Sequence, residues 1–174
     1  MNFILVSPHF PKTYWKFAEG LKKNGFNVLG IGDTPYDLIS NELKSVLTEY
    51  YYCPGMNDYN QLFKAVAFFS FKHGKIDWIE SNNEYWLEKD AQIRTDFNIT
   101  TGVQTKEIRG YKAKSAMKEF YQKAGVPVAR YHIVDDLAGC QKFIQEVGYP
   151  VFVKPNIGVG ANNSYKIKDE TGLI

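Results

Sequence analysis

Short apolar runs alternate with amphipathic segments along the N-terminal part of the chain, and this alternation constrains the fold most. The apolar runs predicted to be strands are residues 3–7, 26–31, 50–52 and 76–80. The segments predicted to be helices begin at Pro11 and span residues 37–47, 58–73 and 84–97. One strand and one helix recur about every 20–25 residues, which is typical of βαβ units and a parallel sheet. The predicted fold class is therefore α/β.

The first predicted helix shows why the segments between the strands are assigned as helices. Tyr14, Phe17, Ala18 and Leu21 recur at i, i+3, i+4 and i+7, which places them along one helical face. Gly25 follows this stripe, and a glycine at that position commonly ends a helix in the left-handed conformation. The segment is predicted to cover one face of the sheet with its apolar side.

A second region begins after residues 99–110, which have no clear periodicity. A helix is predicted from Lys112 or Lys114 to Ala124, and Asp135 or Asp136 is expected to cap a later helix. The later helix carries an apolar stripe and ends near Gly148; its stripe consists of Leu137, Cys140, Ile144 and Val147. Strands are predicted at residues 130–134, 151–155 and 164–168, the last one antiparallel to its predecessor. The predicted domains are therefore 1–105 and 106–174.

Composition excludes several classes of protein. The chain of 174 residues carries a formal net charge of +2, which is too small to indicate a nucleic-acid surface. No run of about 18 apolar residues occurs, so no membrane span is expected. Cys53 and Cys140 have no metal-ligand spacing and are expected to be ordinary buried thiols of a reduced, cytoplasmic protein. Neither nucleic acid nor membrane is predicted as a partner, and no metal ligands are predicted within the chain.

The segment VFVKPNIGVGANNSYKI, residues 151–167, carries the clearest chemical signal. Side chains alternate along a strand, so Val151 and Val153 point one way while Phe152 and Lys154 point the other. Glycines follow Lys154, and glycines let a loop backbone approach a ligand and present N–H groups to an anion. The loop residues predicted to bind a nucleotide are Gly158, Gly160, Ala161, Asn162, Asn163 and Ser164. Together with Lys154 they predict a phosphate clamp.

Two other phosphate-binding motifs do not fit the order of these residues. A Walker A loop places its lysine after the glycines and directly before a helix, whereas Lys154 precedes them and a strand follows. A dinucleotide-binding fingerprint needs a third glycine and a helix, and Gly158-Val159-Gly160 has neither. A hairpin that closes over phosphates is the better interpretation.

Lys-Pro-x-x-Gly-x-Gly after a valine-rich strand, preceded by a helix that ends in Val-Gly-Tyr-Pro, resembles the ATP-grasp superfamily. KSAMKEFYQKAGVPVARY, residues 114–131, is similar to the first ATP-grasp helix with its Ala-Gly-Val-Pro exit. Biotin carboxylases, carbamoyl-phosphate-synthase-like proteins and amino-acid ligases carry this pair. The resemblance implies a Rossmann-like pre-ATP-grasp domain with a parallel sheet, followed by an incomplete α+β ATP-grasp lid subdomain.

The resemblance also implies roles for particular residues. Lys114 would lie near the α-phosphate of ATP, with Lys112 as a neighbour that could be mistaken for it. Lys154 would contact the α- and β-phosphates, and the loop 158–164 would close over the β- and γ-phosphates. Many members have more glycines where this chain has Ala161, Asn162 and Asn163, which leaves the subfamily open. The ligands for Mg²⁺ are expected beyond residue 174.

Other polar residues are weaker candidates. Asn82, Asn83 and Glu84 follow the fourth predicted strand, and ligands of open α/β sheets gather at the carboxyl ends of strands. They are predicted to contact a substrate, although a helix cap made by either asparagine explains them equally well. His9, after the first strand, is a further substrate candidate. Arg94 and Asp96 are expected to be a solvated helix end.

The resemblance implies an ATP-dependent carboxylate ligase, which forms an acyl phosphate that an amine or another nucleophile then attacks. The chain is interpreted as its N-terminal part and is expected to be inactive alone. Two alternatives remain open: a non-catalytic nucleotide- or metabolite-binding module, and one chain of a split ATP-grasp enzyme. The predicted partners are ATP and a small carboxylate, with a homo-oligomer or a missing C-terminal half left open.

Overall fold

The computed structural model describes residues 1–158 and 163–173. These residues form two compact units, Met1–Ile108 and Arg109–Ile174. We call them unit 1 and unit 2 and describe each by itself. The boundary falls near the one expected from sequence, and the functional identities predicted for the two parts of the chain remain predictions.

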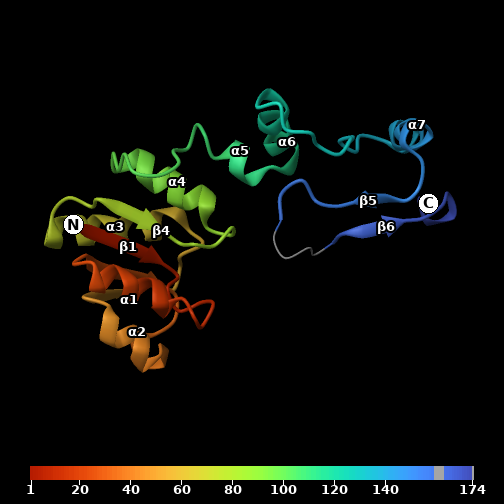
Figure 1. The fold of residues 1–174 in the computed structure, drawn as a ribbon. Helices are drawn as coiled ribbons and strands as arrows, with labels where there is room; N and C mark the ends of the chain where they lie inside the picture. The colour runs from red at the N-terminus through yellow and green to blue at the C-terminus, as the bar shows by residue number, and fades with distance from the viewer. Residues whose placement is uncertain (159–162, 174) are drawn as a thin grey trace. The chain divides into compact units, whose positions relative to one another are not determined.

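Unit 1 is built on a parallel sheet of four strands, as the alternation predicts (Figure 1). The strands are β1 (Asn2–Val6), β2 (Asn27–Gly32), β3 (Glu49–Tyr52) and β4 (Trp78–Glu80), in the order β3-β2-β1-β4. β1 pairs with β2 from Asn2↔Asn27 onward and with β4 from Phe3↔Trp78 onward. The chain therefore continues on one side of β1 with β2 and β3 and on its other side with β4. The strand order changes direction between β1 and β4, whose carboxyl ends lie next to each other. Open α/β sheets bind ligands at such a point.

Helices cover both faces of this sheet. They are α1 (Trp15–Lys23), η1 (Tyr36–Leu38), α2 (Asn41–Val46), α3 (Tyr59–His73) and α4 (Leu87–Asp96). α1 and α2 lie on one side of the strands, and α4 lies on the other (Figure 1). Gly25, with φ of 78°, follows α1 and adopts the left-handed conformation predicted for it.

Alternation along the strands divides the buried side chains into two clusters. Ile4 and Val6 of β1 pack with Leu62 and Phe69 of α3 in one cluster, which α4 also joins. Leu5, between them in sequence, packs on the opposite face with residues of α1 and α2. Because successive strand residues point to opposite faces, the part of a strand that is buried on both sides must be apolar, and β1 is apolar from Phe3 to Val6.

The prediction of one continuous helix over residues 37–47 is wrong. The chain forms the short 3₁₀ helix η1, becomes extended at Ile39, and starts α2 only after Ser40. The Ser40 hydroxyl accepts a hydrogen bond from the Leu43 backbone N–H at 3.2 Å, which makes Ser40 the N-cap of a new helix. An N-cap has non-helical backbone angles, so the helix cannot run through that position.

The described residues of unit 2 form three α-helices and a two-stranded sheet. The helices are α5 (Arg109–Lys112), α6 (Lys114–Lys123) and α7 (Leu137–Val147), with the 3₁₀ helix η2 (Thr171–Leu173) near the end of the chain. The strands β5 (Val151–Val153) and β6 (Tyr165–Ile167) pair antiparallel, with Phe152 opposite Lys166. The expected hairpin is confirmed, and Asp136 caps α7 by accepting a hydrogen bond from the Gly139 N–H at 2.7 Å.

The prediction of a strand at residues 130–134 is wrong. These residues are in no strand, and Ile133 and Val134 are exposed. The backbone N–H and C=O groups of a strand need a neighbouring strand, and no strand among the described residues of unit 2 pairs with this segment. The apolar character that suggested a strand therefore lies on the surface of the unit.

Two further expectations concern cysteines and membranes. Cys53 is buried, but Cys140 is only half-buried. Cys140 belongs to the apolar stripe of α7, which is only partly covered by the rest of the unit. Both thiols are free. Within residues 1–158 and 163–173, no helix has the length and apolar composition needed to cross a membrane.

Candidate functional site

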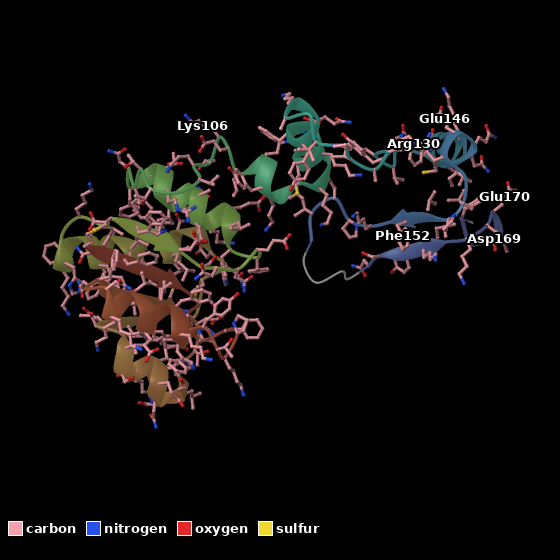
Figure 2. All side chains as sticks on the ribbon, in the orientation of Figure 1. Lys106, Arg130, Glu146, Phe152, Asp169 and Glu170 are labelled. Carbon is pink, nitrogen blue, oxygen red and sulfur yellow. The ribbon has the colours of Figure 1, made fainter. Side chains whose placement is uncertain are left out.

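Strand β5 places Lys154 at its exposed end. Val151 and Val153 are half-buried on one side of the strand, whereas Phe152 and Lys154 are exposed on the other. Phe152 is 66% exposed and stands out from β5 in Figure 2. The alternation predicted for this segment therefore holds, and it directs the ammonium of Lys154 to the open face of the hairpin.

Asn156, two residues after Lys154, fastens this segment to the start of α6. Its side-chain oxygen accepts a hydrogen bond from the Ser115 backbone N–H at 2.9 Å. Its backbone carbonyl accepts another from the Lys114 N–H at 3.0 Å. Ala113, the N-cap of α6, has no side chain that could satisfy these donors, so Asn156 satisfies them instead.

Lys114 lies in the first turn of α6, and its ammonium donates a hydrogen bond to the Gly158 carbonyl at 3.0 Å. The structure therefore brings together two predicted nucleotide-binding residues that are far apart in sequence. Lys112 is distinct from Lys114, because it is buried in α5 and only 7% exposed. Among the described residues, Lys114 contacts the start of the glycine loop at Gly158.

Lys118 is a third lysine of this group, and the sequence analysis did not identify it. The positive charge of Lys154 helps to lower the pKa of Lys118, although burial is the larger cause. A like charge has this effect because it destabilises the protonated form. The signal in the sequence was the spacing of four residues between Lys114 and Lys118, which puts both on one helical face.

The remaining predicted loop residues divide into described and undescribed ones. Gly160, Ala161 and Asn162 lie outside the described residues. Asn163 and Ser164 are exposed just before β6, and Asn163 has a left-handed φ of 56°. Asparagine tolerates this conformation better than most residues do. The described site therefore consists of Lys114 and Lys118 of α6, Lys154 after β5, and the segment from Asn156 to Gly158.

The predicted substrate residues Asn82 and Asn83 lie in a turn after β4. Asn82 has a left-handed φ of 53°, and its carbonyl accepts a hydrogen bond from the Tyr14 hydroxyl at 2.7 Å. The Asn83 side chain accepts one from the Tyr85 N–H at 2.9 Å, so it caps a turn just before α4. Glu84 is exposed in the same turn. These contacts give both asparagines a structural role, and a substrate role remains a prediction.

His9, the fourth substrate candidate, follows β1 and pairs with Asp33, which follows β2. The distance between His9 Nε2 and Asp33 Oδ1 is 3.1 Å. Burial lowers the pKa of His9, while the nearby Asp33 carboxylate acts in the opposite direction. A surface hollow of about 520 Å³ beside α1 is lined by Asn82 together with mostly apolar side chains, and His9 is not among them. The substrate candidates therefore do not share this hollow.

Arg94 is not a solvated helix end, as the sequence analysis expected, but one of the most buried side chains of unit 1. It is 2% exposed and donates to the Ile79 and Val103 carbonyls and to the Glu80 carboxylate. Arg94 Nη2 lies 2.8 Å from Glu80 Oε2. Arg94 points inward because α4 covers the sheet with that side, and each of its three guanidinium nitrogens donates to an acceptor there. Asp96 accepts a hydrogen bond from the Tyr59 hydroxyl.

Asp90, one turn before Arg94 on α4, is also buried and was not identified from sequence. Its Oδ2 accepts hydrogen bonds from the Ser81 hydroxyl at 2.5 Å and from the Ser81 N–H at 3.1 Å. Its Oδ1 has no partner among the described residues. Burial, assisted by the Glu80 carboxylate, raises the pKa of Asp90 to about 7. Asp90 and Arg94 together fix the end of β4 and the turn that follows it.

The described residues contain no group of three or more histidine, cysteine, aspartate or glutamate side chains arranged to hold a metal ion. The lysine group of unit 2 is chemically suited to an anion, because it presents ammonium groups beside a backbone loop.

No family model and no curated protein sequence matches the chain. Its fold is nevertheless similar to solved structures. An L-amino acid ligase from Bacillus licheniformis matches with a TM-score of 0.74 and 18% identity, over 99% of this chain and 40% of that one. The biotin carboxylase domain of Hydrogenobacter thermophilus 2-oxoglutarate carboxylase, in complex with MgADP, ADP and bicarbonate, matches with a TM-score of 0.78 and 21% identity. That match covers 98% of this chain and 38% of the domain.

A biotin carboxylase–β-γ-ATP complex from Campylobacter jejuni matches with a TM-score of 0.76 and 20% identity, over 98% of this chain and 39% of that one. The chain thus spans about 40% of the length of these structures. They are ATP-grasp enzymes, so the fold predicted from the motif resemblance is confirmed. At identities this low the similarity concerns the fold alone.

Proposed function

We propose that this chain is the N-terminal part of an ATP-grasp carboxylate ligase and contributes the phosphate-binding lysines of its nucleotide site. In this proposal residues 1–105 are the pre-ATP-grasp domain and residues 106–174 begin the ATP-grasp domain. The observation that carries the proposal is the hydrogen bond from Lys114 to the Gly158 carbonyl, with Lys154 at the end of β5. It unites in one place the residues that two separate motifs predict to bind phosphate.

The charges of the site suit its proposed role in phosphoryl transfer. The carboxylate oxygen of the acid substrate attacks the γ-phosphorus of ATP, the bond to the ADP oxygen breaks, and an acyl phosphate and ADP form. An amine or another nucleophile then attacks the acyl carbon and releases inorganic phosphate. Negative charge must be neutralised while the phosphoryl group moves, and the ammonium groups of Lys114 and Lys154 supply positive charge.

Mg²⁺ accompanies ATP in such chemistry, and the described residues hold no donor set that fits it. Divalent magnesium prefers carboxylate and other oxygen ligands in octahedral geometry, and lysines provide none. We therefore propose that the site of unit 2 is the part of the nucleotide site without metal ligands. It would hold the phosphates through lysine ammonium groups.

The similar structures suggest which acids to test. One is an L-amino acid ligase, and another was solved with bicarbonate. The experiment is an assay of ADP formation by the full-length gene product with ATP, magnesium and either free L-amino acids or bicarbonate. We expect ADP to form only when the right acid is present, because the phosphoryl group needs an acceptor.

Lys154→Ala is the decisive variant in this assay, with Lys142→Ala as its control. Lys142 lies on α7, outside the lysine group. Loss of one charge-assisted contact is worth roughly 1.5–3 kcal/mol, so Lys154→Ala should reduce ADP formation at limiting ATP by at least about tenfold. Turnover equal to that of the Lys142 variant would refute the proposed role of Lys154.

A further inference from the structure

Lys118 lies one turn beyond Lys114 on α6 and faces the same way. Residues four apart on a helix are neighbours on its surface. Lys118 is half-buried, whereas Lys123, in the last turn of the same helix, is exposed. Among the lysines of α6, Lys114 and Lys118 therefore line one side of the helix, and this is the side where Lys114 contacts the glycine loop.

Two contacts hold the ammonium of Lys118 in place. It donates a hydrogen bond to the Ala129 carbonyl at 2.8 Å, and it lies 4.6 Å from the centre of the Tyr131 ring. An ammonium group has more than one N–H donor, and the carbonyl takes only one. The ammonium of Lys118 can therefore still donate to an anion. It loses little conformational entropy on binding, because these contacts already position it.

Lys118 and Lys154 lie close enough for their charges to interact. Both burial and the ammonium of Lys154 lower the pKa of Lys118, burial being the larger cause. Two like charges repel each other, and an anion placed between them relieves this repulsion as well as attracting each of them. The site is therefore more receptive to negative charge than Lys114 and Lys154 would be on their own.

We propose that Lys118 is a third cation of the phosphate site and makes it select nucleoside di- and triphosphates over monophosphates. This inference rests on the proposed function. A phosphate monoester carries roughly −2 at neutral pH, which two ammonium groups can neutralise. Each further phosphate adds negative charge, and only then does a third cation gain a partner. Lys118 therefore contributes binding energy in proportion to the length of the phosphate chain.

The experiment is a titration of the ¹⁵N-labelled 174-residue chain with ATP, ADP and AMP, followed by NMR. This method measures weak affinities, and the amide signals of Ser115 and Gly158 report binding at this site. The variants are Lys118→Met, Lys118→Arg, Lys154→Ala and Lys123→Met. The Lys123 ammonium lies over the Phe120 ring at 5.7 Å, so its variant removes a comparable charge from the same helix.

We expect Lys118→Met to weaken ATP binding about tenfold and AMP binding less than about threefold. Lys118→Arg should keep most of the preference for ATP, because it keeps the charge. Lys123→Met should change neither affinity. The shared adenosine of ATP and AMP ensures that the difference between them reports the phosphates alone.

Three results would overturn the inference. Equal losses for ATP and AMP in Lys118→Met would mean that Lys118 only positions the segment of Ala129 and Tyr131. Unchanged ATP affinity in Lys118→Met, with binding lost in Lys154→Ala, would remove Lys118 from the site and leave the proposed function standing. If ATP neither shifts the Ser115 and Gly158 signals of this chain nor binds to the full-length gene product, the proposed function itself is refuted.

Discussion

Unit 1 and unit 2 differ in how their residues are held in place. In the described residues, most buried apolar side chains belong to unit 1, and those of unit 2 are Ala113, Ala116 and Ile144. Many large apolar side chains of unit 2 are exposed instead: Tyr111, Phe120, Tyr121, Val126, Ile133, Val134, Leu137, Tyr149, Phe152, Ile157 and Tyr165. Unit 1 is organised by a core, and unit 2 is organised mainly by hydrogen bonds between its segments.

This difference has a consequence for stability and function. Apolar burial contributes about 25 cal/mol per Å², so the stability of the chain should be concentrated in unit 1. The residues proposed to bind phosphate belong to the other unit, where Asn156 and Lys114 hold two segments together. A site held by polar contacts opens more easily than a core, which suits the nucleotide binding proposed for this loop.

The largest effect is expected when a core side chain of each unit is truncated. Phe69 is fully buried on α3, and Phe69→Ala should lower the free energy of unfolding of unit 1 by about 3–5 kcal/mol. Ile144→Ala, in unit 2, should cost less because its neighbours are more exposed. All three tryptophans, Trp15, Trp78 and Trp86, lie in unit 1, so their fluorescence during urea unfolding reports that unit.

The same measurement tests whether the two units unfold separately. Ile144→Ala should leave the tryptophan transition unchanged, while Phe69→Ala shifts it to lower urea. If Ile144→Ala also shifts the tryptophan transition, the two units unfold together, and stability is not concentrated in unit 1.

The buried Arg94 offers a second test within unit 1. Arg94→Met should destabilise unit 1 by about 3 kcal/mol, because the Ile79 carbonyl and the Glu80 carboxylate lose their donor in a largely buried place. Arg94→Lys should cost less, since a single ammonium can reach one acceptor but cannot span them all. Tryptophan fluorescence in urea measures both. If Arg94→Met and Arg94→Lys lower the free energy of unfolding equally, the planar guanidinium with its several donors does not stabilise unit 1.

Asp90 predicts a dependence of stability on pH. Its pKa in the folded protein is raised to about 7, chiefly by burial, whereas an unfolded aspartate titrates near 3.9. Between these values the folded state holds the proton and the unfolded state does not, so this group's contribution is present at low pH and is lost as pH rises through about 7. The loss should approach about 1.4 kcal/mol per pH unit.

Urea unfolding at several pH values from about 5 to about 8 measures this slope. Other groups titrate too, and His9, whose pKa is lowered, acts in the opposite direction. The difference between the chain and its Asp90→Asn variant isolates Asp90, because asparagine does not titrate and keeps an acceptor for Ser81. A difference that does not change with pH would contradict the raised pKa.

The sequence predicted most of unit 1 because its signals are local. Strand runs such as that of β1, and the glycine after α1, specify structure through periodicity and backbone conformation within a few residues. The exception was Ser40, whose capping role competes with an otherwise continuous helical pattern. Arg94 was assigned to solvent for a different reason: charge suggests exposure, and only the tertiary fold supplies the carbonyls that bury it.

Unit 2 was predicted less well, because its order depends on contacts between distant segments. Residues 130–134 read as a strand, but a strand needs a partner, which sequence periodicity does not identify. The motif lysines Lys114 and Lys154 were identified from sequence patterns, and their role in binding phosphate stays a prediction. Lys118 and Asn156 could not be identified in this way, because their roles arise only when the end of β5 meets the start of α6.

The smallest expected effect concerns Asn156, and it tests whether polar contacts hold unit 2 together. Asn156→Ala removes the acceptor for the Ser115 N–H, and loss of a helix cap costs about 1 kcal/mol. The Ser115 amide should then exchange with solvent deuterium about fivefold faster, while amides of β1 stay as they are. Asn156→Asp keeps an acceptor oxygen and should exchange as the unchanged chain does. If the Ala and Asp variants exchange alike, the side chain of Asn156 does not cap α6, and the link between β5 and α6 depends on the backbone bond to Lys114 alone.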